Sequence, residues 1–114
     1  MLPDFSKPAF AFVALSALRF RTTEEGGGPG AYQSDYRCQL RYASASKEVP
    51  DAEVRVYFVG REKVNAGDSA PALLAFLDWE RQREICHEGS AFELREGPGV
   101  IATGVVHAIA TRRR

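Results

Sequence analysis

Alternation of apolar and charged side chains is clearest in the last quarter of the chain. Along residues 91–95, Phe92 and Leu94 point to one side and charged side chains point to the other, which is the period-two pattern of a half-buried strand. Residues 96–99 hold two glycines and a proline, and residues 100–109 are again rich in apolar and β-branched side chains. Two such runs with so short a turn between them predict a β-hairpin, which needs further strands to cover its apolar face.

Four further runs upstream of this hairpin have the composition of strands. They cover residues 9–20, 34–43, 52–59 and 70–79. In the second run, Arg37, Gln39 and Arg41 share one face and the opposite face is apolar. The first run is apolar on both faces, which favours a fully buried strand, although its alanine and leucine leave a helix conceivable. The fourth run reads as a long strand that is prolonged with a bulge or kink through residues 81–88, and its length also leaves a helix open.

Segments rich in glycine, proline and polar residues separate these runs. We expect a flexible loop at residues 19–33, a polar loop at 44–51 and a turn at 60–68. Six short strands joined in this way predict an all-β fold, a single six-stranded antiparallel β-barrel that is closed or nearly closed. The 114 residues suit one domain, with an ordered barrel at about 8–110 and terminal tails at 1–7 and 111–114.

Composition limits the partners more than it limits the fold. Fifteen basic and fifteen acidic side chains cancel, so no net charge attracts nucleic acid or an anionic membrane, and RNA binding would depend on a local patch. No apolar run reaches the roughly 18 residues of a membrane span, and no secretory leader pattern stands at the N-terminus. We therefore expect a cytoplasmic protein with no membrane partner, in which Cys38 and Cys86 lie in separate strands as reduced thiols.

Residue types that carry out catalysis are few and poorly spaced. Cys86, His87 and Glu88 offer a nucleophile, a base and a carboxylate in sequence, but consecutive residues of a strand point to opposite sides. The cysteines and histidines lack the paired spacing of a zinc site, and the glycines at 26–28 are not followed by the Gly-Lys-Ser or Gly-Lys-Thr of a phosphate-binding loop. We expect no enzymatic activity, no metal or other cofactor, and no binding of GTP or another nucleotide.

Three short segments carry a family resemblance. They are residues 36–42 (YRCQLRY), residues 64–68 (VNAGD) and residues 92–106 (FELREGPGVIATGVV). In their order and spacing they resemble a strand, a turn and the closing hairpin of the third, C-terminal β-barrel domain of translation elongation factor Tu, with Cys38 where the family has proline. The resemblance implies that nearly the whole chain forms one such barrel, standing alone without the separate GTPase domain of that family.

The resemblance implies two binding functions. In the family this barrel docks against a GTPase domain and an exchange factor, which implies a non-catalytic module that binds a protein partner in a translation-related role. The family barrel also contacts the T-stem backbone of aminoacyl-tRNA, and Gln39, Glu96 and Gly97 occupy contacting positions, so binding of structured RNA is the alternative. Gln82 replaces a contacting lysine and a contacting threonine falls at about Glu48, and because both changes oppose phosphate binding, the protein partner is preferred.

The same residues allow structural explanations. Gly97 is expected to have a positive φ in the hairpin turn and Glu96 is expected to be exposed there, whether or not they bind RNA. The aromatic residues that could anchor a protein partner or serve the core equally well are Tyr32, Tyr36, Tyr57 and Trp79.

Overall fold

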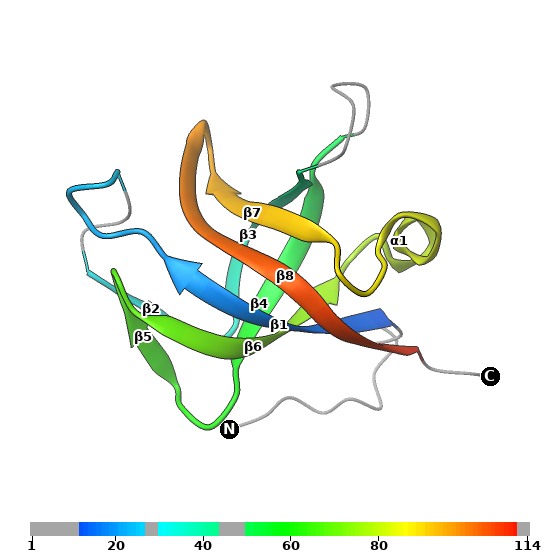
Figure 1. The fold of residues 1–114 in the computed structure, drawn as a ribbon, viewed down its shortest axis with the longest axis horizontal. Coiled ribbons are helices and arrows are strands. Elements are labelled where there is room, and N and C mark those ends of the chain that lie inside the picture. The colour runs from blue at the N-terminus through cyan, green and yellow to red at the C-terminus, as the bar shows by residue number, and fades with distance from the viewer. Residues whose placement is uncertain (1–11, 27–29, 44–49, 112–114) are drawn as a thin grey trace.

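Six strands form a closed antiparallel barrel in the computed structural model, which describes residues 12–26, 30–43 and 50–111 (Figure 1). The strands, in chain order, are β1 (Phe12–Phe20), β3 (Tyr36–Tyr42), β4 (Ala52–Phe58), β6 (Ser69–Phe76), β7 (Ala91–Glu96) and β8 (Gly99–Thr111). Their order around the barrel is β1-β6-β4-β3-β7-β8, which confirms the predicted closed six-stranded fold. The predicted tail at 1–7, residues 112–114 and Glu48 lie outside the described residues.

Alternating side chains fill the inside of the barrel. The largest fully buried ones are Phe20, Phe76, Leu18, Leu40, Leu74, Leu94, Val54, Val56, Val64 and Val106. The predicted division of β3 is confirmed, since Cys38 and Leu40 are buried while Arg37 is exposed on the outer side. The prediction of a fully buried first strand is wrong, because Leu15 and Ala17 remain exposed on the outer side of β1, where only Val13 is buried, beside Tyr57 and Ala75.

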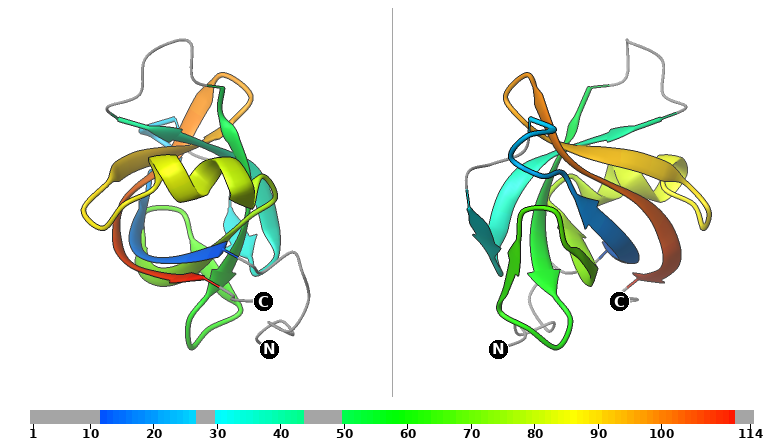
Figure 2. Two further views of the ribbon diagram at one scale, coloured as in Figure 1. Left: turned by 90° about the vertical axis from the view of Figure 1, so that its right-hand side faces the viewer. Right: turned by 60° about the vertical axis from the view of Figure 1, so that its left-hand side comes forward.

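One end of the barrel is covered by a helix that the sequence pattern did not predict. The strand β6 ends at Phe76, and α1 (Trp79–Ile85) follows where we expected a prolonged strand (Figure 2). Residues 80–84 are the strong helix formers Glu, Arg, Gln, Arg and Glu, which show no period-two alternation. Gln82 turns toward the barrel and is buried, as is Cys86, which follows the helix rather than lying in a strand as predicted.

The opposite end is covered by a small second sheet. The strands β2 (Ala31–Gln33) and β5 (Lys63–Asn65) pair with one another in segments that we expected to be a loop and a turn. Each strand is too short to show alternation, yet each places one side chain inward, Tyr32 from β2 and Val64 from β5. The ring of Tyr32 stacks on Phe20 with the ring centroids 4.5 Å apart, so this sheet closes the core.

Candidate functional site

The outer side of the barrel carries two parallel rows of side chains that cross several strands. In the first row, the strand registers bring apolar residues opposite one another on neighbouring strands. They are Pro71 of β6, Ala17 of β1, Val105 of β8 and Ala91 of β7. The neighbouring polar row runs through Ser69 of β6, Arg19 of β1, Thr103 of β8, Glu93 of β7 and Arg41 of β3. Because cross-strand neighbours are in contact range, each row forms a continuous strip of surface.

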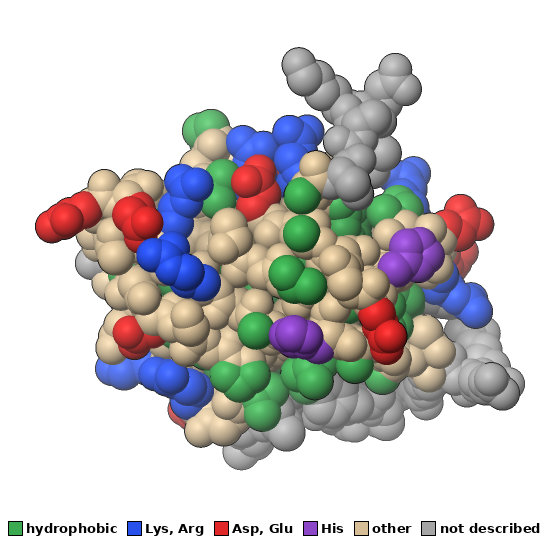
Figure 3. All heavy atoms as spheres, in the orientation of Figure 1, with side chains coloured by type: hydrophobic (Ala, Val, Ile, Leu, Met, Phe, Trp, Pro, Cys, Tyr) green, Lys and Arg blue, Asp and Glu red, His purple; other side chains and the backbone are tan. Residues whose placement is uncertain are grey.

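These two rows line a groove of about 860 Å³ on the outer side of β1, β8, β7 and β3, which we call the outer groove. Val105 is 41% exposed in the groove, and Leu15, two residues before Ala17 on the same side of β1, is 37% exposed. Figure 3 shows hydrophobic side chains along the middle of this face, over β8, with charged side chains on both sides of them. An apolar strip framed by charges is typical of an interaction surface.

The floor of the outer groove depends on a glycine. A Cβ atom at Gly104 would lie 2.7 Å from the Phe92 ring, 2.9 Å from the Ala17 carbonyl oxygen and 2.9 Å from Cδ2 of Leu18. These distances are far shorter than van der Waals contacts, so only glycine lets β8 lie this close to β1 and to the core. The side of Gly104 that a Cβ would occupy faces the core, where the buried side chains of Phe92 and Leu18 already fill the space.

His107 lines the groove beside Val105. It lies two residues after Val105 on the same outward side of β8, and it is exposed. The pairing of β1 with β8 joins Ser16 to Val106 and Leu15 to Ala108, so His107 is also the extra residue of a β-bulge.

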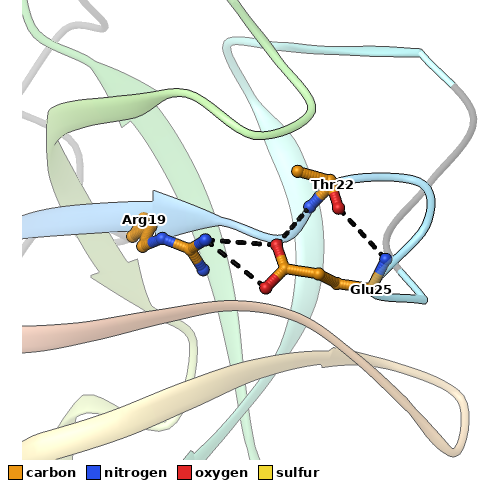
Figure 4. A network of polar contacts seen from close by, with 3 residues as sticks. All are labelled: Arg19, Thr22 and Glu25. Carbon is orange, nitrogen blue, oxygen red and sulfur yellow. Dashed lines mark hydrogen bonds and ion pairs between the residues drawn. The ribbon is translucent and has the colours of Figure 1, made fainter.

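A small polar network holds Arg19 at one end of the groove (Figure 4). An Nη of Arg19 donates to the Glu25 carboxylate at 3.1 Å, and the backbone N–H of Thr22 donates to the same carboxylate at 3.0 Å. The N–H of Glu25 in turn donates to the Thr22 hydroxyl at 3.0 Å. The backbone hydrogen bond from Thr22, followed by Arg19, lowers the pKa of Glu25.

Arg41 lies across the groove from Arg19. Its Nε donates to Oδ1 of Asp51 at 3.1 Å, and among the described residues no other hydrogen bond of this guanidinium is found. Glu93, between the two arginines in the polar row, lies 3.8 Å from an Nη of Arg95. Among the described residues, the charged and imidazole side chains that line the groove are Arg19, Arg41, Glu93 and His107. Each of the two arginines is paired with a carboxylate, Arg19 with Glu25 and Arg41 with Asp51, so the charges at this site are balanced.

A second outer surface, which we call the arginine face, covers β4, β3 and the end of β7. Arg37 of β3 lies directly opposite Arg55 of β4, and Gln39 lies between Glu53 of β4 and Arg95 of β7. Like charges in directly opposite positions oppose sheet pairing. Two ion pairs offset part of this charge, Arg55 with Asp35 at 3.7 Å and Arg95 with Glu93 at 3.8 Å.

The predicted RNA-binding residues lie at the edge of the arginine face, but they do not share one side of the sheet. Gln39 lies opposite Arg95, and Glu96 and Gly97 follow directly in the β7–β8 turn. Gly97 has a φ of +59° and Glu96 is exposed, as predicted. The structure adds one contact, since the Tyr36 hydroxyl donates to the Glu96 carboxylate at 2.5 Å, and no sequence signal joined residues 60 positions apart. Glu96 therefore points toward the inner side of the sheet, away from Gln39.

Gln82 is buried on the barrel side of α1. It is 2% exposed, and its amide oxygen accepts a hydrogen bond from the Tyr42 hydroxyl. The resemblance places a contacting lysine of the family at this position, and here the side chain turns into the barrel. Of the other aromatic candidates, Tyr32 and Tyr57 are both buried. Tyr32 belongs to the main core, whereas Tyr57 packs with Val13 and Ala75 in a small separate cluster on the outer side of the barrel.

The two cysteines are shielded from solvent. Cys38 and Cys86 are buried free thiols, while His87, the next residue after Cys86, is exposed. These two neighbours face apart, although Cys86 follows α1 and does not lie in the strand that we expected. Burial, and then the charge of Glu96, raise the pKa of Cys38 to about 12, and burial also raises the pKa of Cys86, so both thiols stay protonated near neutral pH. Among the described residues, no three His, Cys, Asp or Glu side chains gather as metal ligands would.

Sequence comparisons do not add an assignment. A scan against protein-family models and a search among curated proteins both return no match. Within the described part of the chain, no helix has the length and apolar character needed to cross a membrane. The function is therefore argued from the outer groove and the arginine face.

Proposed function

We propose that this protein is a non-catalytic binding module that binds a protein partner through the outer groove. The observation that carries the proposal is an apolar strip that stays exposed on the outside of a closed barrel, with Val105 at its centre. The strands of the barrel pair with neighbours on both sides, so a partner meets side chains rather than a free sheet edge.

The chemistry of the outer groove suits a protein better than a nucleic acid. Protein interfaces combine an apolar centre with a polar rim, which is the arrangement of the row through Val105 beside the row through Arg19 and Arg41. A phosphate backbone would instead need an excess of cations, and here Glu25 and Asp51 already neutralise the two arginines.

The resemblance to the third domain of elongation factor Tu supports a wider setting for this module. The closed barrel is compatible with that domain, whose function in the family is to dock against other proteins. We include in the proposal a cytoplasmic, translation-related role, with no enzymatic activity of the barrel itself.

Affinity capture from an extract of the source cells tests the proposal. Val105→Glu places a charge in the apolar row, and we expect it to reduce the amount of the captured protein at least tenfold. Val59→Glu is the matched control, because Val59 is similarly exposed but lies at the end of β4, outside the groove. Equal capture by wild type and Val105→Glu, with both variants folded, would contradict the proposed site.

Binding of structured RNA is the second candidate function, and the arginine face favours it. Arg37 and Arg55 oppose each other at a cost in pairing energy that a bound phosphate would relieve. Gln39 lies beside them, and Glu96 and Gly97 mark the adjacent turn. A tRNA complex that persists at physiological salt and is lost on Gln39→Ala or Glu96→Ala would place RNA ahead of a protein partner, whereas weak binding that falls steeply with salt would not.

A further inference from the structure

We infer that α1 is a cap that opens and closes over one end of the barrel while the barrel itself stays folded. Figure 2 shows the helix across this end of the barrel, joined to β6 before it and to β7 after it. The inference does not rest on the proposed function, because no described residue of α1 lines the outer groove.

The helix is too short to be stable without the barrel. It has seven residues, whereas an isolated helix shorter than about 12–15 residues is only marginally stable in water. The side chain of Asp78 makes no capping hydrogen bond to the first turn and instead lies 3.5 Å from Arg81 in an exposed ion pair. The closed position of α1 therefore depends on its contacts with the barrel.

Few of the described side chains of α1 reach the barrel. Along residues 80–84, Gln82 is buried and the four charged side chains are exposed. Ile85, at the end of the helix, is partly buried against the core, and Cys86 directly after it is 2% exposed. Opening of α1 would therefore uncover far less apolar area than unfolding of the barrel, whose strands bury whole rows of large side chains.

A polar contact lies beneath the helix. The hydroxyl of Tyr42, on β3, donates to the amide oxygen of Gln82, and both residues are buried. Both groups can bond to water once the cap is open, so the net gain from their hydrogen bond is small. This contact therefore favours the closed state without locking it.

The pairing of the barrel strands ends just before the helix and resumes just after it. The backbone N–H of Leu77 donates to the Glu53 carbonyl oxygen at 3.1 Å, and the N–H of Gly89 donates to the Val106 carbonyl oxygen at 2.7 Å. The residues between these points and the helix, Asp78 and residues 87–88, are exposed. The chain can therefore turn at both places and move α1 away without breaking the barrel pairing.

Two buried thiols report separately on the cap and on the barrel. Cys86 follows α1 directly, so opening of the cap would give it access to solvent. Cys38 faces the inside of the barrel on β3, opposite Val54 of β4, so it would gain access only when these strands separate. A reagent that modifies thiols therefore distinguishes local opening from global unfolding.

Alkylation of the wild-type protein by iodoacetamide tests the inference. Peptide mass spectrometry gives the initial rate at each cysteine, at pH 8 and at several urea concentrations below the unfolding transition. We expect Cys86 to react at least tenfold faster than Cys38, with a rate that urea changes little, because local opening exposes little surface. The rate at Cys38 should rise steeply with urea. Equal rates with the same urea dependence, or no reaction of Cys86 before the barrel unfolds, would overturn the inference.

A pair of substitutions in α1 tests the contact that holds the cap. Gln82→Ala removes the acceptor of the Tyr42 hydroxyl, and we expect it to raise the alkylation rate at Cys86 at least threefold. Glu84→Ala is the matched control, because Glu84 is exposed on the same helix, and it should leave this rate within twofold of the wild type. Equal rates in the two variants would contradict the assignment of Gln82 as the residue that holds the cap closed.

Discussion

The outer groove and the arginine face lie on neighbouring strands of one barrel, and both use the outward positions of β3 and β7. In the groove, small apolar residues around Val105 leave apolar surface in water. On the arginine face, long cationic side chains oppose one another, with Arg37 directly across from Arg55. The buried inner residues of these strands, such as Leu40 and Leu94, are apolar, so packing of the core does not explain either outer pattern.

This contrast indicates where the information about function resides. The strand registers that bury Leu40 and Leu94 inside the barrel also determine which outward positions lie opposite one another. They do not determine which amino acids occupy those outward positions. Each surface violates a local preference, one by exposing Val105 and the other by opposing Arg37 and Arg55. Such violations are more frequent at functional positions than elsewhere.

The largest effect that we expect is at the floor of the groove. Gly104→Ala should lower the free energy of unfolding by about 1–3 kcal/mol, because its Cβ would overlap the Phe92 ring and the Ala17 carbonyl oxygen. Gly99→Ala, also in β8, is the control, since its Cβ would lie at an ordinary 3.7 Å from the Glu96 carbonyl oxygen. Urea denaturation of both variants gives the comparison, and equal stabilities would show that the groove floor is not tightly packed.

Beneath the arginine face, Cys38 should make the fold sensitive to alkaline pH. Its pKa is about 12 in the folded protein against 9.0 ordinarily, so the unfolded chain loses this proton first and stability falls as pH rises from about 9 toward 12. Burial raises the pKa of Cys86 and Tyr42 as well, which acts in the same direction. From Cys38 alone we expect a loss on the order of 2–3 kcal/mol between pH 8 and pH 11.

Denaturation midpoints measured across this range provide the check. Cys38→Ala is less stable at pH 8 because it leaves a small cavity, but its midpoint should decline less between pH 8 and pH 11. A decline identical to that of the wild type would show that the thiol does not contribute.

At the edge of the arginine face, Glu96→Ala should cost about 0.5–1.5 kcal/mol, because it removes the acceptor of the Tyr36 hydroxyl. An exposed turn residue without such a contact would cost only about 0.5 kcal/mol or less. A double-mutant cycle with Tyr36→Phe measures the coupling, and an energy near zero would restore the smaller value.

The smallest effect that we expect is an increase in the free energy of unfolding, whereas the changes above lower it. Arg37→Glu replaces a like-charge pair with an opposite-charge pair across from Arg55, so we expect it to stabilise the protein by about 0.2–1 kcal/mol at low salt. The gain should shrink in 0.5 M salt, because exposed charges are screened. Destabilisation at both salt concentrations would show that Arg37 contributes packing that outweighs the repulsion.

Strict alternation made much of the barrel predictable from sequence. The inward and outward sides of β3 and β7 follow directly from residues such as Leu40 and Leu94 beside Gln39 and Glu93. The outer side of β1 was misassigned, because Leu15 and other apolar residues there resemble a buried strand when the neighbours are unknown.

Tertiary context explains what the pattern missed. The helix α1 forms from residues with good helix propensity, but its position depends on the barrel end that it covers through Gln82 and Cys86. The outer groove depends on the registers that join Ala17, Val105 and Ala91 from three distant segments, and no local pattern contains those registers. The residues of the arginine face were noted in sequence, while the pairing of Arg37 with Arg55 needed the structure.

The central claim is that the outer groove, rather than the arginine face, holds the biological partner. Affinity capture with wild type, Val105→Glu and Arg37→Glu, each with and without nuclease, tests it most directly. We predict that the principal captured protein is lost at least tenfold with Val105→Glu and is unchanged by Arg37→Glu or by nuclease. A partner that disappears with Arg37→Glu and with nuclease, but is retained by Val105→Glu, would contradict the account and assign binding to the arginine face.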